Sequence, residues 1–381
     1  MESQPNCGCS CQHQKPDMTP AESWVPPGVP VQIARSSDST ASSRSLPSWI
    51  TGYVETPAGR VPEVSTRLSA GDVLGAWKAR WNIRRMHYHI DPGLYAVGRP
   101  GPESTVLVTA NYKLSFDQLR QELGGRDAWL LVLDTRGINV WCAAGKGLFS
   151  TDELIKRIQA TGLERVITHR TLILPQLAGP GVSVHRVRQE SGFRVMYGPV
   201  RARDLPAFLD NGRKATPAMR TVTFTLADRL ILMPVEFVTV MKYFLYYLAA
   251  VVLLEVFLGP GTLRHLSMLT VPVLGALLLG TVLVPALLPW LPFRSFTLKG
   301  WLPGLLWAAA VSAVAGADPW QTAGNLLLLP VLSAGFALTF TGSTTFTSQT
   351  GVNREISLYA RPMAISGLLG VAGMVLGLIF R

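Results

Sequence analysis

The fold of this protein is organised around the stretch Asn139-Val140-Trp141-Cys142-Ala143-Ala144-Gly145-Lys146. This stretch follows an apolar run, residues 129–133, which ends in Asp134 and a turn at Gly137. Apolar runs bounded by turn signals are typical of the buried strands of a parallel sheet. Asn139 is a favourable helix N-cap, and the two alanines favour helix. The sequence therefore predicts a buried strand, a turn and a helix that begins after Asn139.

The position of Cys142 in that helix leaves two interpretations open. In the first helical turn, exposed amide dipoles favour a thiolate over a thiol. A single cysteine just past the end of a buried strand is where an α/β protein places a metal or cofactor ligand. However, a free cysteine also behaves as a small hydrophobic residue, so Cys142 could be a buried structural residue. The local pattern alone weighs these two interpretations about evenly.

Strands and helices are expected to alternate around this stretch. Expected strands lie at residues 106–108, 129–133, from 166 and at 193–197. Capping boxes at 115–118 and 150–153 predict helices that end near residues 124 and 162, and a further helix is expected at 205–209. Repeated strand–helix alternation predicts an α/β fold with a Rossmann-like, doubly wound parallel sheet. The ends of two strands, Thr109-Ala110-Asn111 and Asp134 to Cys142, then meet at the edge where such folds bind ligands.

The N-terminal part of the chain divides into a tail and the start of the folded region. Residues 1–48 are rich in Pro, Ser, Gln and Thr, which predicts a disordered tail. The triplet Cys7, Cys9 and Cys11 could chelate a soft metal, but exposed thiols without a fixed role are the favoured interpretation. Leu74, Trp77 and Trp81 recur at helical spacing in an expected helix at 69–81, and residues 87–89 alternate like a strand. We expect a cytosolic α/β domain at 49–235.

The composition excludes several functions. The formal net charge is +11, but no nucleic-acid-binding signature accompanies it, so we expect no nucleic-acid partner. No Walker lysine loop and no Gly-x-Gly-x-x-Gly follows a first strand, which argues against a nucleotide site. No Ser-His-Asp triad or carboxylate pair can be placed from spacing. Basic residues that flank hydrophobic spans explain the charge more simply.

The C-terminal part, residues 236–381, is expected to be a transmembrane helical domain. Five apolar spans, at 237–258, 266–293, 301–317, 322–341 and 362–380, are each close to the roughly 20 residues that cross a bilayer. A kink is expected in the second span at Pro285 or Pro289. Before the spans, residues 221–226 and 229–233 resemble a β-hairpin. The distribution of Arg and Lys predicts a multi-pass protein of the inner, cytoplasmic membrane with its N-terminal domain in the cytoplasm.

The stretch at 139–146 resembles the signature of the mercury-methylating corrinoid protein family, HgcA. The stretches at 108–113, 172–177, 197–202 and 340–344 are also similar to that family, so the resemblance runs from about Trp49 to the C-terminus. Residues 108–113, 172–177 and 197–202 are shared more loosely with corrinoid iron–sulfur proteins of acetyl-CoA metabolism. The cysteines of the tail are not part of the motif.

The resemblance implies an enzyme, a corrinoid-dependent methyltransferase that transfers a methyl group to Hg(II) and forms methylmercury. It implies a cobalamin-type corrinoid with Cys142 as lower axial ligand of cobalt and as the catalytic residue. The implied partners are a ferredoxin-like iron–sulfur protein (HgcB-type) as electron donor, a methyl-donor methyltransferase of the folate pathway and membrane lipid. The predicted cofactor-binding residues are Thr109, Ala110, Asn111, Asp134, Asn139, Val140, Trp141, Cys142, Ala143, Ala144, Gly145 and Lys146.

Two alternative functions accompany this prediction. The chain could be a corrinoid methyl carrier of one-carbon metabolism, in the acetyl-CoA pathway, for which mercury is not the acceptor. It could also be a membrane protein that binds cobalamin without turnover. The cysteine beside Trp141 argues against the carrier, because the carbon-fixing relatives are expected to lack that ligand.

Overall fold

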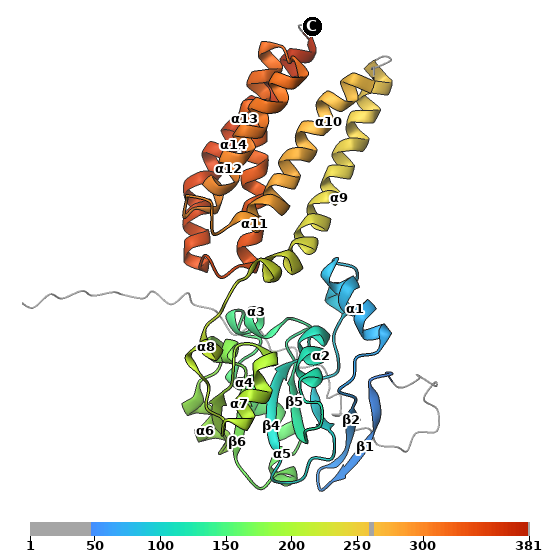
Figure 1. The fold of residues 1–381 in the computed structure, drawn as a ribbon, viewed down its shortest axis with the longest axis vertical. Coiled ribbons are helices and arrows are strands. Elements are labelled where there is room, and N and C mark those ends of the chain that lie inside the picture. The colour runs from blue at the N-terminus through green and yellow to red at the C-terminus, as the bar shows by residue number, and fades with distance from the viewer. Residues whose placement is uncertain (1–46, 259–262, 380–381) are drawn as a thin grey trace, which may run out of the picture. The chain divides into compact units, whose positions relative to one another are not determined.

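The computed structural model describes residues 47–258 and 263–379. They form a mixed α/β sheet domain followed by long apolar helices, which agrees with the predicted layout (Figure 1). The expected tail at 1–48, with Cys7, Cys9 and Cys11, lies almost entirely outside the described residues.

The sheet has seven strands in the order β1-β2-β3-β5-β4-β6-β7. Four of them, β5, β4, β6 and β7, run parallel, as predicted. The prediction is wrong for the rest of the sheet, because β3 is antiparallel to β5 and β1 pairs with β2 as a hairpin. Residues 98–104, between β3 and β4, contain no helix, and so short a connection cannot make a parallel crossover. The strand bounds are β1 Ile50–Thr56, β2 Gly59–Val64, β3 Gly93–Val97, β4 Thr105–Ala110, β5 Ala128–Leu133, β6 Thr171–Leu174 and β7 Arg194–Tyr197.

Helices cover both faces of the parallel strands. Leu154 of α4 and Val187 of α6 belong to the core on one face, whereas Phe116 of α2 and Phe208 of α7 belong to the core on the other. The chain therefore winds in one direction from β4 to β5 and in the opposite direction from β6 to β7. The helix bounds are α1 Ala70–Arg80, α2 Lys113–Gln121, α3 Val140–Gly145, α4 Thr151–Ala160, α5 Leu163–Val166, α6 Val184–Ser191, α7 Leu205–Asp210 and α8 Pro217–Arg220, with short 3₁₀ helices η1 Arg85–His87, η2 Gln176–Gly181 and η3 Ala202–Asp204.

Two local predictions in the α/β domain misplace an element boundary. Helix α2 begins at Lys113 after Tyr112, and not at the expected capping box of Ser115. The strand expected from Val166 begins at Thr171, because residues 163–166 form the short helix α5. Helix α2 begins without a side-chain cap that would mark its start, and the apolar pair Val166-Ile167 closes α5 instead of opening a strand.

Three expected strands, one at 87–89 and two in a hairpin at 221–233, are absent. Residues 87–89 lie at the end of η1 and make only an isolated bridge from His89 to Tyr112. The hairpin expected at 221–233 is absent, because Thr225 caps a helix there: its hydroxyl accepts from the Asp228 N–H at 3.3 Å, and Asp228 accepts from the Thr225 N–H at 2.9 Å. This reciprocal capping satisfies the free amides of a helix start.

The expected apolar spans are confirmed as helices long and apolar enough to cross a membrane, and the described residues contain five of them. The second is interrupted by a π-helical turn, Leu279–Leu283, immediately before Pro285. Proline lacks the N–H that the α-helical ladder needs, which accounts for the interruption near one of the two predicted positions. The bounds are α9 Leu226–Leu258, α10 Leu263–Leu278, α11 Val284–Leu287, α12 Phe296–Ala315, α13 Pro319–Thr339 and α14 Gln349–Ile379, with the 3₁₀ turn η5 Phe340–Ser343 between the last two.

Candidate functional site

The connection from β5 to α3 places the cysteine. The chain leaves the fully buried strand β5 at Asp134 and turns at Arg136 and Gly137, whose φ values are 55° and 71°. Asn139 then caps α3, as predicted, and its side-chain oxygen accepts a hydrogen bond of 2.9 Å from the Cys142 N–H. Cys142 therefore lies in the first turn of α3, and its side chain is partly exposed and unpaired.

Asn111 holds this connection in place from the neighbouring strand. Its side-chain oxygen accepts hydrogen bonds from the Thr135 N–H, the Thr135 hydroxyl and the Gly137 N–H at 3.1, 2.9 and 2.9 Å. Its amide nitrogen donates to Asp134 at 3.3 Å. Because Asn111 is buried and its polar atoms are used, its position indicates that it shapes the turn before Asn139. A contact between this side chain and a cofactor stays a prediction.

The remaining residues of the stretch 139–146 divide into core and surface. Val140, Ala143 and Ala144 belong to the core between α3 and the sheet. An added Cβ at Gly181 would collide with the Phe149 carbonyl oxygen and would lie 3.1 Å from the Cα of Ala144, so a glycine is needed where η2 packs against α3. Trp141, Gly145 and Lys146 are exposed. The alanines therefore serve the close packing of α3 and leave one face of its first turn open.

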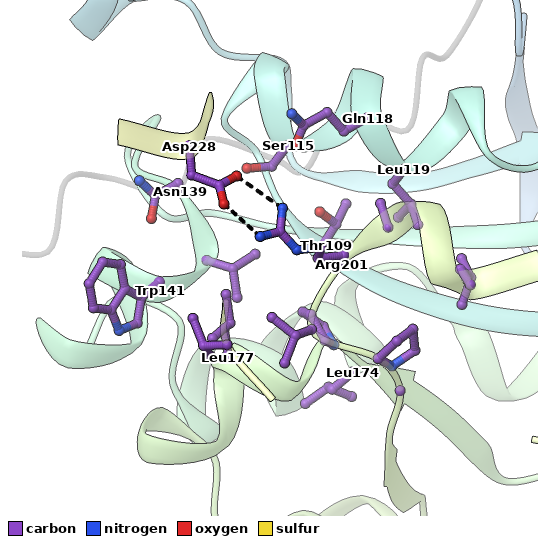
Figure 2. Close-up of a pocket in the computed structure, with 18 of the residues that line it drawn as sticks. Thr109, Ser115, Gln118, Leu119, Asn139, Trp141, Leu174, Leu177, Arg201 and Asp228 are labelled. Atoms are coloured by element: carbon purple, nitrogen blue, oxygen red, sulfur yellow. Dashed lines mark hydrogen bonds and ion pairs between the residues drawn. The ribbon is translucent and has the colours of Figure 1, made fainter. Parts of the chain in front are cut away.

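A cavity of about 450 Å³ lies at the carboxyl ends of β4 and β6 (Figure 2). These two strands feed connections that run in opposite directions, so the cavity occupies the switch point where doubly wound folds bind ligands. Among the predicted site residues, Thr109, Asn139, Val140 and Trp141 line it. The others do not: they are Ala110, Asn111, Asp134, Cys142, Ala143, Ala144, Gly145 and Lys146.

The wall of this cavity contains a charged pair that the sequence did not predict. Arg201 donates two hydrogen bonds to Asp228, at 3.0 and 2.7 Å, and further bonds to Thr223, as Figure 2 shows for the carboxylate. The hydrogen bonds to Asp228 raise the pKa of Arg201. Arg201 belongs to the stretch 197–202 that resembles the corrinoid family, which could have pointed to it. A hairpin turn is expected around Asp228, so the sequence does not indicate its pairing with Arg201.

A second charged cluster lies away from the cavity. Lys113 donates to Asp72 and Asp117 at 2.7 Å, and Arg120 donates to the same carboxylates at 2.9 and 2.8 Å. Burial would raise the pKa of Asp72, but hydrogen bonds from Lys113 and Ser69 outweigh it and hold that pKa well below its usual range. All four side chains are enclosed, so this cluster fastens α1 to α2 and offers no site.

The described residues contain no group of three or more His, Cys, Asp or Glu side chains that could hold a bare metal ion. A metal inside a macrocycle needs only one or two ligands from the protein, because the ring supplies the others. Cys142 is the one cysteine among the described residues; it is partly exposed and directly follows Trp141, which lines the cavity, so it is a candidate for such a ligand.

The comparisons with known proteins match the α/β domain. Residues 83–209 match the family model described as the CO dehydrogenase/acetyl-CoA synthase delta subunit. The acetyl-CoA decarbonylase/synthase complex subunit gamma of Archaeoglobus fulgidus is 32% identical over 136 residues, which are 34% of this chain and 28% of that protein. The subunit gamma of Methanopyrus kandleri is 35% identical over 124 residues, which are 32% of this chain and 26% of that protein.

The chain thus spans about a quarter of the length of these curated relatives, at 28% and 26%. The matches support a resemblance to the corrinoid-protein family of the acetyl-CoA synthase system. They do not support mercury methylation specifically. The residues that the family model matches end at 209 and include neither α1 nor the apolar helices.

Proposed function

We propose that this chain is a membrane-anchored, corrinoid-dependent methyltransferase whose acceptor is Hg(II). The observation that carries the proposal is the placement of Cys142, partly exposed in the first turn of α3 and directly after Trp141, which lines the cavity at the switch point. The resemblance of residues 139–146 to the mercury-methylating family supports the acceptor. A bound corrinoid supplies a cobalt ion that can carry a methyl group.

The residues around the cofactor would bind and orient it. Cys142 would hold the cofactor through its sulfur, since a soft thiolate suits a soft metal centre. Asn139 fixes the first turn of α3, and Asn111 fixes the loop before it, so the sulfur would be held on a rigid support. Thr109 and Trp141 would contact the bound group at the cavity wall. Asp134 and Lys146, both exposed, stay candidates for peripheral contacts.

A second candidate function is favoured by the comparisons. The matched region, residues 83–209, points to the acetyl-CoA synthase system, and so supports a methyl carrier of one-carbon metabolism better than it supports mercury methylation. In that function the same cofactor would pass its methyl group to an acceptor within a protein complex. Cys142 would then be a ligand that tunes the cofactor, and Hg(II) would not be the physiological acceptor.

The partners and location follow as part of the proposal. Electrons would come from a ferredoxin-like iron–sulfur protein (HgcB-type), and the methyl group would come from a methyltransferase of the folate pathway. The five apolar helices would insert the chain in the cytoplasmic membrane, with the α/β domain in the cytoplasm. Those boundaries, 49–235 and 236–381, stay predictions.

One purified preparation can separate these functions. The full chain, loaded with corrinoid and methylated, is offered Hg(II) or an acetyl-CoA synthase as acceptor. We expect methylmercury from the wild type, background levels from Cys142→Ala and unchanged levels from Lys156→Ala, an exposed residue on α4. The visible spectrum of the cobalt should also change in Cys142→Ala.

The outcomes differ for each alternative. Methyl transfer to the synthase alone establishes the carrier function. A cobalt spectrum without transfer to either acceptor establishes a binding protein without turnover. Undiminished methylmercury formation by Cys142→Ala, with an unchanged spectrum, would refute the ligand assignment.

A further inference from the structure

Helix α1 presents an apolar face away from the domain that carries it. Asp72 and Ala79 are the buried residues of this helix, whereas Val73, Leu74 and Trp77 are 58%, 51% and 51% exposed. Trp81 follows Trp77 at helical spacing, and the two rings lie 5.7 Å apart. The apolar surface continues beyond the helix to Ile83 and Met86, which are 47% and 64% exposed. Large exposed apolar surfaces mark sites of interaction.

The helix is held rigidly in this orientation. Its N-terminus is closed by a reciprocal capping box between Ser69 and Asp72. Asp72 is in turn fixed by Lys113 and Arg120 of α2, and its backbone carbonyl accepts from the Tyr88 hydroxyl at 3.2 Å. The helix therefore cannot turn its apolar face inward without breaking a buried ion cluster.

The charged side chains around this apolar face are all positive. Residues 73–90 contain no Asp or Glu, but they contain four cations, Lys78, Arg80, Arg84 and Arg85. Tryptophan and leucine on one face with lysine and arginine beside them are typical of helices that lie in the headgroup region of a membrane. Cations close to an anionic membrane surface are attracted to it.

A contact with α9 places the segment at a definite level of the first apolar helix. The Asn82 side-chain nitrogen donates to the Thr239 hydroxyl at 3.2 Å. From Thr239 to Leu258 is 19 residues, which at about 1.5 Å per residue is roughly 29 Å, close to the hydrocarbon thickness of a bilayer. Lys242 and Tyr243 lie within about one helical turn of Thr239, and Tyr243 is 64% exposed. Tyrosine and lysine gather at the membrane–water interface.

We propose that residues 73–86, the surface of α1 and η1, insert into the cytoplasmic headgroup layer of an anionic membrane beside α9. This inference rests on the membrane insertion that the proposed function includes, and not on the chemistry at Cys142. The α/β domain is then held to the bilayer at a second place, in addition to its covalent connection through α9. The family model matches from residue 83 onward, so α1 itself lies outside the region that the family model covers.

The test uses the full chain in lipid nanodiscs with a fluorescent label at Leu74→Cys. The background carries Cys7→Ser, Cys9→Ser, Cys11→Ser and Cys142→Ala, so cofactor chemistry does not enter. Lys156→Cys, exposed on α4, is the reference label. We expect the label at residue 74 to be quenched several-fold more by nitroxide lipids, and several-fold less by iodide, than the label at residue 156. A second label at Met86→Cys should behave like the label at Leu74→Cys.

The charge contribution is tested in the same preparation. Replacing Lys78, Arg80 and Arg84 by Glu, or using nanodiscs of neutral lipid alone, should reduce the lipid quenching at residue 74 towards that at residue 156. Recovery of each variant with the nanodisc lipid confirms insertion of the apolar helices separately. Equal iodide access at residues 74 and 156 in anionic nanodiscs overturns the proposal. If iodide quenching of the label at residue 74 decreases only when a ferredoxin-like protein is added, the proposal is also overturned, in favour of a protein-docking surface.

Discussion

Two clusters of charged side chains in this protein have opposite surroundings. The side chains of Asp72, Lys113, Asp117 and Arg120 are at most 9% exposed and pair with one another. The Arg201–Asp228 pair lies in a cavity wall and its side chains are 26% and 25% exposed. Water can compensate the second pair when it breaks, but it cannot reach the first. The buried cluster therefore stabilises the packing of α1 against α2. The Arg201–Asp228 pair can break and rearrange at the cavity.

Removing one cation from the buried cluster should have the largest effect. Arg120→Leu leaves two buried carboxylates with one partner and removes hydrogen bonds to the carbonyls of Ser65 and Arg67. Loss of one partner of a buried ion pair costs about 3–5 kcal/mol. We expect a loss of that order, measured as faster hydrogen exchange of the α1 and α2 amides in the detergent-solubilised chain. Arg126→Leu, which breaks an exposed pair with Asp210, is the control and should leave exchange unchanged.

Breaking the cavity pair should have a smaller and more local effect. Arg201→Gln removes a two-point ion pair that is about a quarter exposed, and such a pair contributes at most about 1 kcal/mol. The amides of the first turn of α9 should exchange about fivefold faster, while those of α1 and α2 should not change. Arg203→Gln, at an exposed neighbouring position, is the matched control. Equally faster hydrogen exchange of the α9 amides in both variants would show that Arg201 does not hold the start of α9.

Lowering the pH should weaken the stability that the buried cluster contributes only in acid, and this effect should be smallest near neutrality. The pKa of Asp72 in the folded protein lies below its ordinary value. Its stabilising contribution is therefore fully present above the unfolded pKa of about 3.9 and is lost as the pH falls through the folded pKa. We expect the free energy that protects the α1 amides to be constant from about pH 7.5 to 5, and to fall only below about pH 4.

The matched variant for this pH experiment is Asp72→Asn, which removes the carboxylate at residue 72. Its α1 amides should exchange faster at every pH and should show a weaker decline in acid. A decline that already begins near pH 6 in the wild type would place the responsible group elsewhere.

The sequence could predict those parts of the site that depend on neighbours along the chain. Asn139 caps α3 because a side-chain oxygen two or three residues before a free amide can reach it whatever the fold. The buried strand β5 and the five apolar helices follow equally from uninterrupted apolar composition. For the same reason, the sequence indicated that Cys142 lies in a first helical turn.

The sequence could not predict contacts that join distant segments. Arg201 meets Asp228 across 27 positions, and Asn111 holds a loop 26 positions away. The expected hairpin at 221–233 was wrong because alternation over a few residues does not reveal a capping pair such as Thr225 and Asp228. The direction of β3 also depends on its partner strand, which local pattern does not specify.

By itself, the sequence determined the α/β character of the first domain, the cap that places Cys142 and the apolar helices that follow. Each of these is a local property, because the side chains of a few neighbouring turns or of one strand decide the stability of that element. Only the tertiary structure decided that the sheet is mixed, that a cavity opens at the ends of β4 and β6, and that Arg201 and Asp228 line it. It also decided that Leu74 and Trp77 face outward, because the buried pairing of Asp72 with Lys113 and Arg120 fixes which side of α1 meets the domain.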